Sequence, residues 1–143
     1  MRKRFDRQLF DENDSQARHV VSQYLQYTRD CMVQDNPDIY GVDLLMTGAL
    51  GDITAIEVEV KRVWKEGPGF PWDCVQLPER KRRYMDCGYP IEYWILNNTL
   101  EYAIVIPGSA VARAIPVEIP NKYVSHGELF VQIPINECSM RFL

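Results

Sequence analysis

Acidic and basic side chains alternate with valines along one short segment, residues 56–62, which reads IEVEVKR. In an extended strand successive side chains point to opposite faces, so Glu57, Glu59 and Lys61 are expected to share one face. Neighbours on that face are about 6.5 to 7 Å apart, and adjacent carboxylates repel each other unless a cation or an amine neutralises them. The segment therefore predicts a cluster of carboxylates with one ammonium group.

Another carboxylate, Asp43, lies one apolar run earlier in the chain. The runs at residues 39–46 and 53–63 flank a glycine-containing turn, which is typical of a β-hairpin. We expect cross-strand pairing to bring Asp43 alongside Glu59. Two or three carboxylates beside one amine form a set of hard oxygen ligands that suits Mg²⁺ or Mn²⁺ and suits zinc poorly.

The elements that must position these side chains are also visible in the sequence. In residues 14–28 apolar side chains recur with helical spacing, and Asp14 or Ser15 is the candidate N-cap. Proline and glycine bracket a short polar helix at residues 78–88. Further strands, some of them broken by prolines, are predicted at residues 91–96, 100–106, 115–119, 129–135 and 140–143.

This order of elements predicts the α/β class, with a central mixed β-sheet flanked by helices. A chain of 143 residues, of which 46% are apolar, suffices for one ordinary domain. We expect residues 1–13 to form a flexible basic arm, residues 14–106 to hold the site, and residues 107–143 to add short strands. The charged first residues and the lack of a long apolar run predict a cytoplasmic protein with no membrane partner.

Several common enzyme sites lack their required residues. The four cysteines form no C-x-x-C pair, and the two histidines, His19 and His126, stand at no metal-binding spacing. The glycine motifs of nucleotide-binding loops and of serine hydrolases do not occur. Any metal ion is therefore expected to be held by carboxylates.

Positive charge is concentrated next to the carboxylate segment. Residues 61–83 contain seven basic and three acidic side chains, whereas the whole chain has a net charge of -4. One interpretation is a solvated helix face. The other is a surface that brings a polyanion close to bound cations.

The carboxylates and the amine resemble the motif of the PD-(D/E)XK nuclease superfamily, which includes restriction endonucleases and Holliday junction resolvases. Asp43, in the segment YGVDL, and the later Glu59-Val60-Lys61 carry the resemblance, together with the order of elements. Val42 stands where the family's name places a proline. The local pattern alone is also that of a half-exposed antiparallel strand with alternating charges.

The resemblance implies a restriction-endonuclease-like fold and a role for each motif residue. Asp43 and Glu59 would hold the divalent metal ion together with the carbonyl group of Val60. Lys61 would orient or activate the attacking water, and Glu57 would be an accessory ligand. Members often carry an acid on the first helix, for which the candidates are Asp14 and Glu12, and they often present polar side chains to the phosphates. The residues expected to contact DNA are Gln76, Arg80, Lys81, Arg83, Arg62 and Lys65.

The predicted function is that of a Mg²⁺-dependent or Mn²⁺-dependent endodeoxyribonuclease, with branched or Holliday-junction DNA as the sharper expectation. By the same resemblance we expect a homodimer of phage or prokaryotic origin. We expect it to act in the cytoplasm, or in the host cytoplasm if the chain is viral. The alternative is a catalytically inactive module that binds nucleic acid or another protein. An adaptor without any nucleic-acid role is a third reading, to which the acidic isoelectric point near 5.2 gives some weight.

Overall fold

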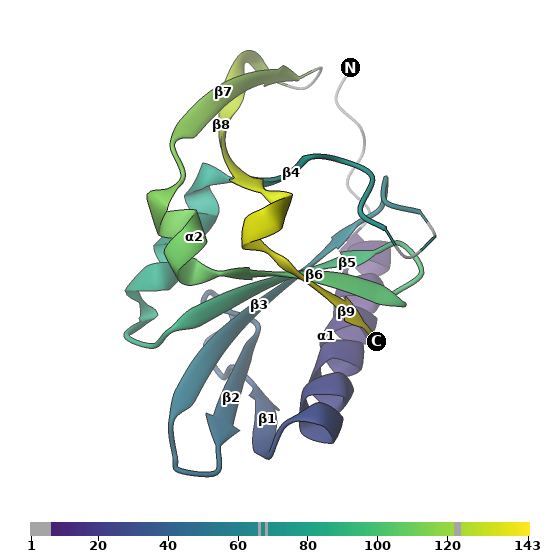
Figure 1. Cartoon of the computed structure of the whole chain (residues 1–143), viewed down its shortest axis with the longest axis vertical. Helices are drawn as coiled ribbons and strands as arrows, with labels where there is room; N and C mark the ends of the chain where they lie inside the picture. Colours follow the sequence, from purple (N-terminus) through teal and green to yellow (C-terminus); the bar gives the residue numbers. More distant parts are fainter. Residues whose placement is uncertain (1–6, 66, 68, 122–123) are drawn as a thin grey trace.

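A six-stranded mixed sheet forms the centre of the molecule in the computed structural model, which makes it an α/β protein (Figure 1). The structure describes residues 7–65, 67, 69–121 and 124–143. The strand order is β1-β2-β3-β5-β6-β9. Their bounds are β1 Cys31–Asp35, β2 Leu44–Gly48, β3 Ile53–Lys61, β5 Ile91–Asn97, β6 Tyr102–Pro107 and β9 Ser139–Phe142. All neighbours in this sheet are antiparallel except β3 and β5, which run parallel.

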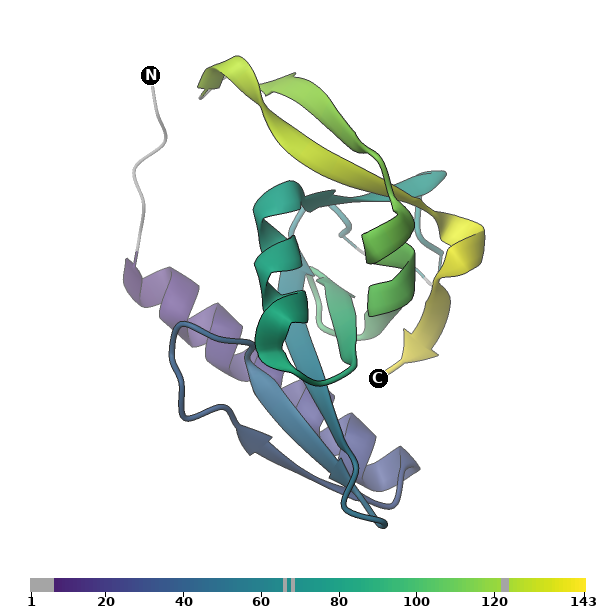
Figure 2. The same cartoon turned by 90° about the vertical axis from the view of Figure 1, so that its left-hand side faces the viewer.

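One face of the sheet is covered by helix α1, Arg7–Thr28 (Figures 1 and 2). Its apolar stripe of Ala17, Val21 and Leu25 is fully buried and packs on the side chains of Ile56 and Val58. The predicted helix is therefore confirmed, but it begins at Arg7 and not at Asp14 or Ser15. The extra turns contain neither glycine nor proline, so nothing in residues 7–13 interrupts the helix. No described helix has the length and apolar character that a bilayer-spanning segment requires.

Two sequence expectations fall at this N-terminal end. Residues 7–13, assigned to the basic arm, belong to α1, whereas the rest of that arm, residues 1–6, lies outside the described residues. The side chains of the two candidate helix acids, Glu12 and Asp14, also lie outside the described part.

The other face of the sheet is covered by two short helices and a second sheet (Figure 2). The helices are η1, a 3₁₀ helix spanning Glu79–Cys87, and α2, Gly108–Arg113. The second sheet has the order β4-β8-β7, with bounds β4 Cys74–Pro78, β7 Pro116–Asn121 and β8 Val124–Pro134. Its inner side chains, such as Val75 and Ile133, are fully buried in a core shared with Tyr93 of β5.

The two predicted strand pairs are both confirmed. Strands β2 and β3 pair as an antiparallel hairpin that closes at Thr47 and Ile53, and β5 and β6 pair up to Leu96 and Ala103. The first hairpin strand begins later than expected, at Leu44. The residues before it form turns instead, because the Asn36 and Asp38 side chains accept hydrogen bonds from nearby backbone N–H groups.

Four of the described elements were absent from the sequence expectations: β1, β4, α2 and the short 3₁₀ helix η2, Ile135–Glu137. Strand β1 has the residues CMVQD, which show no clean alternation, and it is positioned by its antiparallel pairing with β2. The prolines mark strand ends and edges as expected, since β7 is an edge strand that begins at Pro116 and β8 ends at Pro134. The predicted polar helix at residues 78–88 is confirmed as η1, and Gly88 ends it with a left-handed φ of 89°.

Candidate functional site

Strand β3 places its acidic side chains on the face of the sheet that is covered by η1. Ile56 and Val58 point to the opposite face and pack beneath α1, so the predicted alternation holds along the strand. Glu57 is 5% exposed, which is unusual for a carboxylate. Glu59 is half-buried. Glu57 was expected to be an accessory residue, but the fold makes it the most enclosed acid of the group.

Asp43 joins this cluster from the residue before β2. Leu44 pairs with Ile56, so continuing the register by one residue places Asp43 opposite Glu57. The Asp43 carboxylate also accepts a hydrogen bond of 2.8 Å from the backbone N–H of Val58. The expected neighbour, Glu59, lies two residues further along β3. The cross-strand partner of Asp43 is therefore Glu57, because the hairpin turn sets the register.

The negative charge of Asp43 acts on the carboxyl group of Glu57, which lies opposite it in the β2–β3 register. Burial of the carboxyl, followed by the negative charge of Asp43, raises the pKa of Glu57 to about 8, against the opposing effect of Lys81. The buried Oε1 atom of Glu57 has no hydrogen-bond donor among the described residues. A carboxyl pair in this position is stabilised by a proton or by a bound cation, since two neighbouring negative charges repel each other.

Lys81, from η1, is the amine that contacts these carboxylates. Its Nζ atom lies 3.0 Å from Glu57 Oε2 and 4.0 Å from Glu59 Oε2, and its side chain is only 18% exposed. Burial lowers the pKa of Lys81, but the charges of Glu59 and Glu57 outweigh burial and the net pKa is raised. The Lys81 amine therefore stays protonated between the two glutamates.

Lys61, the amine expected from the sequence, lies elsewhere. Its Nζ atom is 5.4 Å from the centre of the Trp72 ring, a cation–π contact at the end of β3. Trp72 is 41% exposed and stacks edge-on against Phe70. The sequence predicted that the Lys61 amine would lie beside the carboxylates, whereas in the structure it lies beside Trp72.

The carboxylates meet part of the requirement for a metal site. Among the described residues, no three His, Cys, Asp or Glu side chains are arranged to hold a metal ion as they stand. The Lys81 ammonium group lies where Glu57 and Glu59 would otherwise offer oxygens to one ion. Asp43 and the Glu57 Oε1 atom, which has no hydrogen-bond donor among the described residues, are two oxygen groups of the kind that divalent cations prefer. Val60 lies where β3 extends beyond its pairing with β2.

Two of the basic side chains expected to contact DNA form ion pairs within the chain. Arg80 forms an ion pair with Glu128 of β8, and Lys81 is turned inward to the carboxylates. The neighbouring Arg82 donates to the carbonyl oxygens of Val111 and Ala114, at the end of α2. Arg80 remains exposed on the surface, as do the candidates Arg83, Gln76, Arg62 and Lys65.

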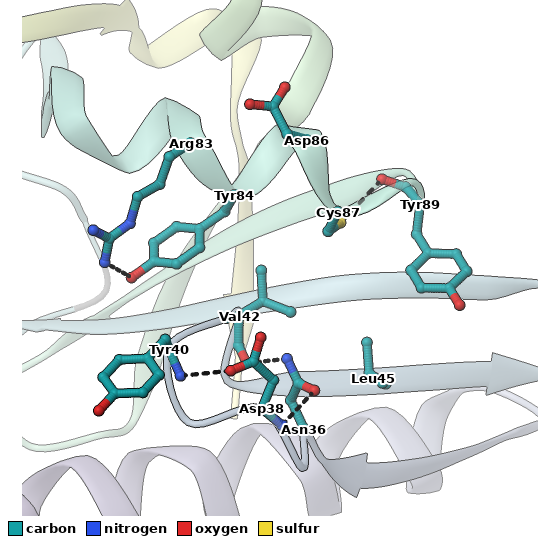
Figure 3. A pocket seen from close by; sticks show the side chains of 11 residues that line it. Asn36, Asp38, Tyr40, Val42, Leu45, Arg83, Tyr84, Asp86, Cys87 and Tyr89 are labelled. Atoms are coloured by element: carbon teal, nitrogen blue, oxygen red, sulfur yellow. Dashed lines mark hydrogen bonds between the residues drawn. The ribbon is translucent and has the colours of Figure 1, made fainter.

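A hollow of about 500 Å³ lies between η1 and the loop before β2 (Figure 3). Val42 and Leu45 form its apolar floor, and Tyr40 and Tyr89 lie at its two ends. Arg83 lies over the Tyr84 ring and donates to its hydroxyl oxygen at 3.1 Å on the η1 side of the hollow. The side chains that line the hollow do not include the clustered residues Asp43, Glu57, Glu59 and Lys81.

Fold and site together define an α/β protein with a buried carboxylate–amine cluster at the junction of β2, β3 and η1. Neither the comparison with protein-family models nor the comparison with curated proteins finds a match for this chain. The geometry of the site is therefore the basis for the function proposed below.

Proposed function

We propose that this protein is a metal-dependent endodeoxyribonuclease of the PD-(D/E)XK type, with a restriction-endonuclease-like fold. The observation that carries the proposal is the position of Asp43 opposite the buried Glu57 in the β2–β3 register, together with a Glu57 oxygen that has no hydrogen-bond donor among the described residues. The order of elements supports it: a helix, a hairpin bearing the acids, a polar helix and a further strand pair.

Asp43 and Glu57 would hold the divalent ion, Mg²⁺ or Mn²⁺, with Glu59 and the carbonyl group of Val60 as further oxygen donors. When bound, such an ion lowers the pKa of a coordinated water and polarises a phosphate oxygen. Hydrolysis transfers the water's hydroxyl group to phosphorus, breaks one P–O bond and gives the leaving oxygen a proton. The chain contributes an enclosed, partly desolvated cluster whose carboxylates are pre-positioned by the β2–β3 register.

DNA is the proposed substrate, and a branched or four-way junction is the proposed form of it. The surface side chains Arg83, Arg62 and Lys65 are available to contact phosphates, whereas Arg80 is ion-paired with Glu128 and Lys81 with the carboxylates. One chain therefore offers few phosphate contacts, and salt-dependent affinity grows with their number. This favours a homodimer, in which two copies would double the contacts.

The test is a cleavage assay on supercoiled plasmid, a four-way junction and a plain duplex, each with Mg²⁺, Mn²⁺ or a chelator. We expect metal-dependent cleavage that Asp43→Asn and Glu57→Gln each reduce by about 100-fold or more. Glu101→Gln is the matched control, because Glu101 is an exposed acid outside the cluster. Full metal-dependent cleavage by either cluster variant would show that these carboxylates do not hold the ion.

A catalytically inactive module that binds nucleic acid or another protein is the second candidate. The observation in its favour is that the Lys81 ammonium group already lies beside Glu57 and Glu59 without a metal ion. Isothermal titration with Mn²⁺ separates the two candidates. The nuclease binds the ion through Asp43 and Glu57, whereas the module gives the same response as the Asp43→Asn variant.

A further inference from the structure

We infer that Lys81 of η1, and not Lys61 of β3, supplies the amine of this site and contacts the scissile phosphate. This inference rests on the nuclease function proposed above and assigns the cationic group of that same site. It depends on three observations. The register places Asp43 opposite Glu57 and not Glu59, the Lys81 amine contacts the glutamates, and a hydrogen bond fixes the Lys81 backbone.

The acidic pair lies too far from Lys61 for that lysine to act at it. The register places Asp43 opposite Glu57, and Lys61 is four residues further along the same strand. At about 3.3 Å per residue this separation is roughly 13 Å between backbone positions. The Lys61 amine points to Trp72 instead.

Lys81 reaches the acids from the opposite layer. Its amine lies 3.0 Å from Glu57 and 4.0 Å from Glu59, so it already occupies the space between the two side chains. A phosphate bound beside this pair would meet the same ammonium group. A divalent ion binding to Glu57 would release the Lys81 amine, which is then free to bind a phosphate oxygen.

Tyr93 holds Lys81 in this position. The Tyr93 hydroxyl group donates a 2.7 Å hydrogen bond to the backbone carbonyl of Lys81. Tyr93 is fully buried and pairs with Glu57 across the β3–β5 ladder. The strand that neighbours the acid therefore also fixes the segment that carries the amine, which makes Tyr93 a positioning residue.

The experiment compares Lys81→Met with Lys61→Met as matched variants. In the cleavage assay we expect Lys81→Met to lower kcat by about 100-fold or more, the usual effect of losing one preorganised cationic donor. Lys61→Met should stay within about threefold of the wild type, and Lys81→Arg should recover part of the activity. Loss of cleavage in Lys61→Met with full cleavage in Lys81→Met would overturn the inference and leave the proposed function standing.

A second measurement does not require DNA cleavage. Because the Lys81 ammonium group competes with a cation for Glu57, Lys81→Met should bind Mn²⁺ about tenfold more tightly in isothermal titration. Lys61→Met should bind Mn²⁺ like the wild type. Equal affinities in the wild type and Lys81→Met would overturn the inference, even if the wild type cleaved none of the substrates and the proposed function had failed.

Tyr93→Phe tests the positioning role and provides for the case in which Lys81→Met does not fold. It removes one hydroxyl group and leaves every charge in place. We expect kcat to fall by about tenfold with an unchanged KM for DNA. Wild-type kcat in a folded Tyr93→Phe protein would contradict the assigned position of Lys81.

Discussion

The buried acid Glu57 should make the stability of the metal-free protein fall as the pH rises. Its pKa is about 8 in the folded protein, compared with an ordinary value of 4.5. Between these two values the folded state binds more protons than the unfolded state, so the free energy of unfolding decreases with increasing pH. The stabilisation is complete below pH 4.5 and is lost as the pH passes through 8.

The size of the effect follows from the same pKa values. One pKa unit corresponds to about 1.4 kcal/mol, and the interval from pH 6 to the folded pKa covers roughly two units. Because Glu57 is 5% exposed, solvent screens this change little. We therefore expect the free energy of unfolding to fall by roughly 2 to 3 kcal/mol between pH 6 and pH 9.

Urea unfolding at pH 6 and pH 9, with a chelator present, measures this difference. In Glu57→Gln the amide replaces the protonated acid beside Asp43, so the variant should lose most of the pH dependence. Glu101→Gln, which changes an exposed acid, should keep it. The same decrease in stability in the wild type and in Glu57→Gln would refute the assignment of the raised pKa to Glu57.

Two further predictions concern the elements that frame the site. Asn97 is fully buried, and its side-chain oxygen accepts 3.0 Å hydrogen bonds from two backbone N–H groups of the β5–β6 turn. Asn97→Ala should lower the free energy of unfolding by about 2 to 4 kcal/mol, and the exposed Asn98→Ala by less than about 0.5 kcal/mol; similar urea midpoints would contradict this. Gly88 has a φ of 89°, so Gly88→Ala should cost about 1 kcal/mol. Gly69→Ala, in open space without a positive φ, is its control, and thermal unfolding should separate the two variants.

Local patterns in the sequence were sufficient to predict the elements whose side chains repeat along a single apolar or polar face. The apolar stripe of α1, the two hairpins, and the glycine that ends η1 all follow from contacts within a few residues. The shared face of Glu57 and Glu59 follows from the same reasoning, because strand geometry alternates side chains whatever the strand packs against. Strand β1 had no such pattern, and its pairing with β2 decided its structure.

The tertiary structure alone decided which charges meet. The hairpin register makes Glu57, and not the predicted Glu59, the cross-strand neighbour of Asp43. The alternation pattern could not distinguish the two, because residues two apart lie on the same face of a strand. The packing of η1 over β3 brought Lys81 to an acid 24 residues away in the chain and left Lys61 beside Trp72. Side-chain types and strand periodicity specify which face of the sheet a side chain lies on. The distance between that side chain and a residue of the covering helix depends on the packing of the whole core. For this reason the sequence by itself determined which face of β3 carries the charged side chains, and the three-dimensional packing determined which of these side chains meet.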